Sequence, residues 1–102
     1  MMQRYKLYTL PIFENDLIEI LDYIAFTLEN PTASDQLLNE IKDAVDKRLS
    51  APSAFEKYYP KGLNEPHYRI WVKNYLIFYV VADDVMELRR IVYNKRDVEN
   101  LI

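Results

Sequence analysis

Four residues near the middle of the sequence, Lys57, Tyr58, Tyr59 and Lys61, combine positive charge with aromatic side chains. This combination is typical of surfaces that hold single-stranded nucleic acid, because lysine attracts phosphate and tyrosine stacks on bases. The same residues are also compatible with two tyrosines that cover one end of a core and two solvated lysines. Both interpretations stay open, with Lys57 and Lys61 as candidate substrate-binding residues.

The residue types that most catalytic and metal-binding motifs require are nearly absent from the 102 residues. There is no Cys, which excludes disulfides, thiolate zinc sites and a cysteine nucleophile. One His excludes paired-histidine metal motifs, and one Gly excludes glycine-rich phosphate loops. We therefore expect neither a metal nor a cofactor, and a chain without Cys is typical of the reducing cytoplasm.

The charge is acidic overall and unevenly distributed. A net charge of −3 and a pI of about 5.1 argue against a general nucleic-acid binder, which usually carries a basic surface. Residues 1–50 hold five Lys and Arg against nine Asp and Glu, whereas residues 51–102 hold eight against seven. An anionic partner is therefore expected on the C-terminal half. The longest hydrophobic run, at residues 75–82, is too short for a membrane span of about 20 residues.

Two amphipathic helices follow a short first strand. Residues 5–10 are aromatic and aliphatic and end at Pro11, which is typical of a strand. Apolar residues then repeat at helical spacing over residues 13–29 and again over residues 31–49. Asn30 is the expected N-cap of the second helix. Because the turn at Asn30 is so short, the two helices must form an antiparallel hairpin.

Three further strands follow a long loop at residues 50–66, a length that is often functional. Residues 67–73 alternate between polar and apolar, and residues 75–82 are almost all apolar, like a central strand buried on both faces. Residues 85–93 form the last predicted strand, and the polar tail at residues 94–102 is predicted to form one helical turn at most.

Together these elements predict a single α+β domain that covers residues 1–102. Its element order is β-αα-βββ, with the helical hairpin packed on one face of an antiparallel sheet. The first strand is expected to join the edge of that sheet.

Five short groups of residues, in a fixed order along the chain, carry a resemblance to a known family. They are Asp16-Leu17 with Ile20 and Tyr23-Ile24, Asn30-Pro31 with Leu37-Leu38, Tyr68-Arg69-Ile70, Asn74 to Tyr79, and Ile91 with Tyr93 and Arg96-Asp97. This set resembles the RelE/ParE superfamily of bacterial toxins from type II toxin-antitoxin systems, over nearly the whole chain. The resemblance implies a cytoplasmic toxin that arrests bacterial growth and is held inactive by a cognate antitoxin.

The superfamily acts in two unlike ways. RelE-like members enter the ribosome and cut mRNA without metal or cofactor, whereas ParE-like members poison DNA gyrase. Cleavage by a 2′-hydroxyl needs positive charge at the phosphate and a proton donor for the leaving oxygen. Ribosome-dependent mRNA cleavage, as a metal-independent endoribonuclease, is the first hypothesis here. The alternatives are gyrase poisoning without nuclease activity and a non-toxic protein-interaction module.

Carried over by position, the resemblance implies two arginines at the phosphate. Arg69 falls on a basic position of the second strand, and Arg96 falls on the catalytic arginine that follows the last strand. A guanidinium can hold two phosphate oxygens at once. Trp71 and Leu76 stand where RelE-like enzymes carry further basic residues, and a gyrase poison does not need those residues.

Three more residues complete the candidate site. His67 shares a strand face with Arg69, and histidine is a common acid or base; a polar surface histidine is the alternative. Tyr93, close to Arg96 in sequence, is a candidate for stacking on a base or an ordinary strand residue. Trp71, exposed by the alternation, is the candidate anchor for the antitoxin, because tryptophan is enriched at binding hot spots.

Overall fold

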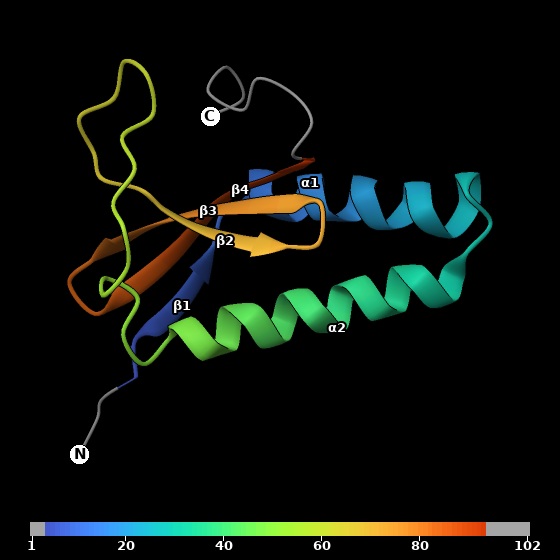
Figure 1. The fold of residues 1–102 in the computed structure, drawn as a ribbon, viewed down its shortest axis with the longest axis horizontal. Helices are drawn as coiled ribbons and strands as arrows, with labels where there is room; N and C mark the ends of the chain where they lie inside the picture. The colour runs from blue at the N-terminus through green and yellow to red at the C-terminus, as the bar shows by residue number, and fades with distance from the viewer. Residues whose placement is uncertain (1–3, 94–102) are drawn as a thin grey trace.

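A helical hairpin and a four-stranded sheet make up the fold (Figure 1). The computed structural model describes residues 4–93, so the predicted polar tail lies outside the described residues. The elements are β1 (Lys6–Thr9), α1 (Pro11–Asp22), η1 (Tyr23–Thr27), α2 (Pro31–Arg48), β2 (Tyr68–Val72), β3 (Tyr75–Ala82) and β4 (Val85–Tyr93). The predicted α+β class and β-αα-βββ order are confirmed.

The strands lie in the order β1-β4-β3-β2. β2, β3 and β4 form the expected antiparallel meander. β1 joins the edge, as expected, but it runs parallel to β4, with Lys6 opposite Val85. The helical hairpin explains this direction, because α2 returns the chain to the start of β1, where the Tyr5 amide donates to the Leu49 carbonyl at 2.8 Å. The sheet is therefore mixed, and only three of its strands are antiparallel.

The second helix begins where its sequence signals place it. Asn30 Oδ1 accepts a hydrogen bond from the Ala33 amide at 3.1 Å, which is the predicted N-cap. Pro31 occupies the first helical position, where its missing amide hydrogen has no cost. The Ser34 hydroxyl donates to the Leu21 carbonyl at 3.0 Å and so ties α2 to α1.

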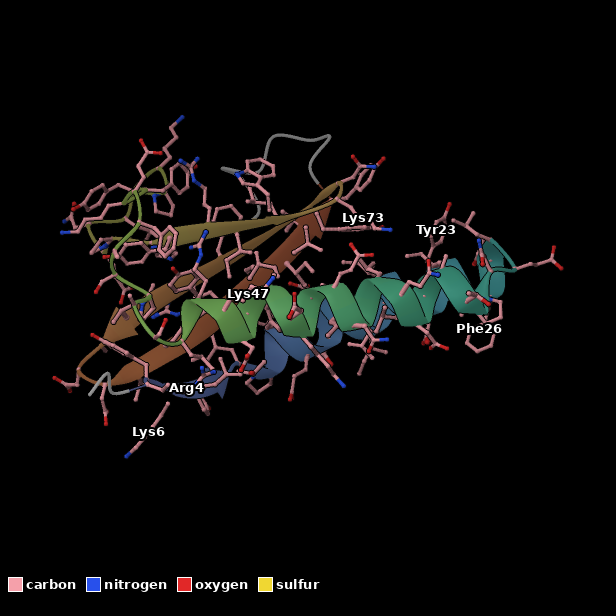
Figure 2. The ribbon with its side chains drawn as sticks, turned by 60° about the horizontal axis from the view of Figure 1, so that its bottom comes forward. Arg4, Lys6, Tyr23, Phe26, Lys47 and Lys73 are labelled. Carbon is pink, nitrogen blue, oxygen red and sulfur yellow. The ribbon has the colours of Figure 1, made fainter. Side chains whose placement is uncertain are left out.

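The first helix changes its winding before the turn. α1 ends at Asp22 and the next turn, η1, is π-helical, whereas the sequence predicted a continuous α-helix to about Glu29. The Leu28 amide donates to the Tyr23 carbonyl, five residues earlier, at 2.9 Å. π-Helical turns are rare and are frequently found at functional sites. Here the turn leaves Tyr23, Phe26 and Leu28 exposed, and Figure 2 shows Tyr23 and Phe26 on opposite sides of the hairpin end.

The main core lies between the hairpin and one face of the sheet. Its buried residues come from both α-helices and from β2, β3 and β4: Phe13, Leu37, Ile41, Val45, Tyr68, Ile70, Val72, Ile77, Tyr79, Met86, Leu88 and Ile91. A smaller cluster of Leu76, Phe78 and Val92 lies on the opposite face, against Tyr58 of the long loop. β3 is therefore buried on both faces, as its apolar sequence predicted.

An aspartate covers the part of β4 that β1 does not reach. β1 pairs only as far as Leu88, and α1 follows beside the rest of β4. Asp16 Oδ2 accepts from Arg90 Nε at 2.7 Å and from the Ile91 amide at 3.3 Å, while Oδ1 accepts from Arg90 Nη2 at 3.0 Å. The Asp16 carboxylate thus accepts a hydrogen bond from the Ile91 amide at the edge of β4. It also forms an ion pair with Arg90, the residue before Ile91. The hydrogen bond from Arg90 to Asp16 raises the pKa of Arg90.

Candidate functional site

Arg69 of β2 points away from the hairpin, because its neighbours Tyr68 and Ile70 point into the main core. Its Nη2 lies 3.3 Å from Glu56 Oε1, and its guanidinium carbon lies 4.5 Å from the centre of the Tyr58 ring. A carboxylate and an aromatic face both stabilise a guanidinium. A phosphate bound at Arg69 would therefore compete with Glu56.

His67, directly before β2, is only 2% exposed, so the surface position considered from the sequence is wrong. Its backbone exchanges two hydrogen bonds of 2.7 Å with Tyr58, and this bridge brings the long loop against it. Its Nδ1 lies 2.9 Å from the Glu65 carbonyl oxygen. Because a carbonyl only accepts, Nδ1 is the donor in this hydrogen bond. This geometry gives His67 a structural role between the loop and β2.

A second arginine, which the sequence analysis did not single out, also faces the long loop. Arg89 Nη2 lies 3.3 Å from Glu65 Oε2, and Arg89 Nε lies 3.3 Å from Glu87 Oε2. Arg89 stands at an irregularity in the pairing of β3 and β4, where Phe78 faces Arg90 and the next residue of β3 faces Leu88. Such a bulge redirects a side chain. Its sequence signal was a pair of arginines, Arg89 and Arg90, in a strand whose only other charged residue is Glu87.

The four residues of the long loop that the sequence grouped together have different environments in the structure. The ring of Tyr58 lies 5.8 Å from that of Phe78 and covers the smaller cluster, whereas Tyr59 is exposed. Lys57 and Lys61 are exposed, and neither makes an ion pair within the described chain. Tyr58 therefore covers part of the core, as the second interpretation of the sequence predicted. Lys57 and Lys61 are accessible to an anionic partner.

Trp71 and Tyr93 are exposed near one end of the sheet. Trp71 is 54% exposed, as the alternation predicted, and lies opposite Leu76 of β3, which is buried. Tyr93 is 43% exposed, and its ring centre lies 5.5 Å from that of Tyr75. Arg96 lies outside the described residues. Of the three predicted catalytic residues, the described part of the chain therefore contains two, Arg69 in β2 and His67 directly before it.

Two grooves flank the hairpin. The larger, of about 690 Å³, lies between the end of the hairpin and the ends of β3 and β4. The smaller, of about 390 Å³, lies between the hairpin and β1, and its apolar lining consists of Leu7, Phe13, Leu17, Leu38, Ile41, Val45, Leu49 and Leu88. An apolar groove on a helical hairpin suits the apolar face of an amphipathic segment.

The described residues lack two features that would indicate other classes of protein. Between residues 4 and 93, no three His, Cys, Asp or Glu side chains are grouped so that they could hold a metal ion. In that same part of the chain, no helix combines the length and apolar character needed to cross a membrane.

Solved structures with this fold include bacterial toxins. The chromosomal ParDE toxin-antitoxin system from P. aeruginosa matches with a TM-score of 0.72 and 14% identity, over 88% of this chain and 96% of that chain. A copper-bound mutant toxin from Helicobacter pylori matches with a TM-score of 0.54 and 23% identity, over 87% and 93%. A conserved hypothetical protein from Helicobacter pylori matches with a TM-score of 0.59 and 25% identity, over 90% and 97%. The fold is that of the small toxins of toxin-antitoxin systems.

The family model described as the ParE toxin of the type II toxin-antitoxin system, parDE, matches residues 9–98. The chain therefore belongs to the ParE toxin family, and the resemblance to the RelE/ParE superfamily is confirmed. No curated protein sequence matches this chain. Membership of a type II system implies an antitoxin as partner.

Proposed function

We propose that this ParE-family chain arrests bacterial growth by poisoning DNA gyrase and that it does not cleave mRNA. The observation that carries the proposal is the environment of three residues in and beside β2 and β3. Arg69 is held by Glu56 and Tyr58, His67 is buried with its Nδ1 proton on a carbonyl, and Leu76 is buried where RelE-like enzymes have an arginine.

Cleavage of mRNA requires charge stabilisation and proton transfer at the same phosphate. His67 would have to leave its buried position to donate a proton to a substrate, and Arg69 would have to exchange its carboxylate for a phosphate. A protein that acts by binding gyrase needs neither change. The described surface therefore favours binding over catalysis.

Ribosome-dependent mRNA cleavage is the second candidate. It is favoured by Arg69 and Arg96, which fall on family positions, and by the exposed Lys57 and Lys61 of the long loop. Tyr93, which is exposed at the end of β4, is available to stack on a base in this mechanism. Either target would place the protein in the cytoplasm.

For the antitoxin, we propose two contact regions. Trp71 is a large exposed aromatic residue beside the smaller cluster, and such residues commonly anchor partners. The apolar groove between β1 and the hairpin offers a second region for an amphipathic antitoxin segment. The two regions lie on opposite sides of the sheet, so one antitoxin chain would have to wrap around it.

The test compares the two targets in cells that express the chain without an antitoxin. We expect growth arrest, gyrase trapped on broken DNA and intact mRNA on translating ribosomes. Growth arrest with cleaved mRNA and no trapped gyrase would replace this proposal with the nuclease. Normal growth at high soluble expression would favour the non-toxic interaction module.

Two arginine variants sharpen this comparison. Under the nuclease hypothesis, Arg96→Ala or Arg69→Ala should reduce mRNA cleavage by about 10²–10³-fold, because each removes a phosphate contact in the transition state. Arg4→Ala is the matched control, because Arg4 is an exposed arginine paired with Asp46 beside the hairpin. Under our proposal, no mRNA cleavage is detected in the wild type or in any of the three variants.

A further inference from the structure

Three tyrosines from separate elements meet in the larger groove: Tyr23 of η1, Tyr75 of β3 and Tyr93 of β4. The rings of Tyr75 and Tyr93 are tilted by 58°. Burial raises the pKa of Tyr75, and the nearby hydroxyls of Tyr93 and Tyr23 raise it further. Ile20 and Leu28 add apolar surface, and Glu19 adds a carboxylate. We call this the tyrosine groove.

Acidic side chains outnumber basic ones around the tyrosine groove, which is lined by Asp16, Glu19 and Arg90. Between Lys6 and Lys42 the chain contains seven Asp and Glu and neither Lys nor Arg. Glu19 lines the groove and makes no ion pair within the described chain. Arg90 also lines the groove, but its guanidinium donates two hydrogen bonds to the Asp16 carboxylate. The groove therefore presents aromatic faces and negative charge to a partner.

We propose that the tyrosine groove binds a basic amphipathic helical segment of a protein partner. A Lys or Arg side chain of that segment lies among the tyrosine rings, because the face of a tyrosine attracts a cation. Glu19 pairs with a second cation, and the apolar face of the segment packs on Ile20 and Leu28. This site is separate from Trp71 and from the groove beside β1, and it does not depend on whether gyrase or mRNA is the target.

Charge complementarity selects this occupant over others. Nucleic acid is disfavoured because the carboxylates repel phosphate. A second copy of the chain would bring the same acidic hairpin to the groove. The chain's own residues 94–102 follow directly from Tyr93 and include Lys95 and Arg96, and the experiment distinguishes them from a partner.

The experiment is an NMR titration of the full-length chain with two synthetic peptides. One peptide carries leucines at helical spacing with lysine and arginine on its other face, and the other has glutamate at every basic position. We expect the basic peptide alone to bind, with shifts at Ile20, Leu28 and the three tyrosines. Tyr23→Ala should weaken this binding by between about twofold and thirtyfold. Glu19→Lys should weaken it by about two- to fivefold.

Each variant has a matched control within the chain. Tyr59→Ala removes a tyrosine that is as exposed as Tyr23, and Asp35→Lys reverses an exposed carboxylate of α2 that lines neither groove. Both controls should bind the basic peptide like the wild type. The proposal would be overturned by any of three results: equal losses of peptide affinity in the control variants, equal binding of the acidic peptide, or chemical-shift changes at residues outside the groove. Contacts between residues 94–102 and the groove in the free protein would also overturn it, because the occupant would then be the chain itself.

Discussion

Replacing Asp16 by Asn tests how the hairpin is held to the sheet. The substitution keeps the shape of the side chain but removes its charge. In the wild type this carboxylate accepts three hydrogen bonds, two from the guanidinium of Arg90 and one from the Ile91 amide. The variant removes the carboxylate charge that pairs with Arg90 beside the core.

The expected loss follows from the partial burial of the pair. The side chain of Asp16 is 15% exposed and that of Arg90 is 26% exposed. Removing one partner of a fully buried pair costs about 3–5 kcal/mol, and a hydrogen bond to a charged group contributes about 1.5–3 kcal/mol. Discounting for the exposed fraction, we expect Asp16→Asn to lower the free energy of unfolding by about 2–3 kcal/mol. For a domain of this size the Tm should fall by about 8–24 °C.

The assay is urea unfolding followed by circular dichroism, with Asp43→Asn as the control. Asp43 pairs with Lys47 one turn away on α2, at 3.0 Å, but its side chain is 64% exposed. An exposed pair of this kind contributes only about 0.3–0.5 kcal/mol. A double-mutant cycle with Arg90→Gln should give a coupling energy of at least about 1 kcal/mol.

Equal losses for Asp16→Asn and Asp43→Asn would refute this reasoning. That result would mean that packing between α1 and β4, and not the ion pair, attaches the hairpin. A loss of the expected size without coupling to Arg90 would instead assign the effect to the Ile91 amide alone.

Three further outcomes are expected. Asn30→Ala should lower the free energy of unfolding by about 1 kcal/mol in a urea titration, because it removes the N-cap of α2. Burial raises the pKa of Tyr79 above 10.0, against the opposing hydrogen bond from Arg48. The contribution of Tyr79 to stability is therefore complete below about pH 10 and is lost as the pH rises through the folded pKa. Tyr79→Phe should lack this alkaline loss in urea titrations between about pH 8 and pH 11. Trp71→Ala should weaken antitoxin binding by about 30–1000-fold in calorimetry, whereas Tyr59→Ala should leave it unchanged.

The parts of the fold that depend on local patterns were predictable from the sequence. The bounds of β3 and β4 agree with the prediction because a continuous apolar run and a turn at Asp83 define them. The cap at Asn30 is also a local signal. The exposure of Trp71 follows from the simple alternation along β2.

The parts that depend on distant contacts were not predictable from spacing. Nothing in the order of residues sets the direction of β1, which follows from the path of the hairpin. The burial of His67 arises because Tyr58 bridges to it across the loop. In the sequence, Asp16 is one of several acidic residues of a helix. In the structure, its carboxylate pairs with Arg90 of β4, 74 residues later in the chain. The predicted role of Arg96 stays a prediction.

The parallel pairing of the first and last strands also sets when the sheet closes during synthesis. Lys6 leaves the ribosome about 80 residues before its partner Val85, which at about 5–20 residues per second is an interval of roughly 4–16 s. During that time the hairpin has emerged while most of its covering sheet has not. The four-stranded sheet therefore cannot close until synthesis has passed Val85, and for these seconds the apolar face of the hairpin lacks most of the sheet that covers it in the folded protein.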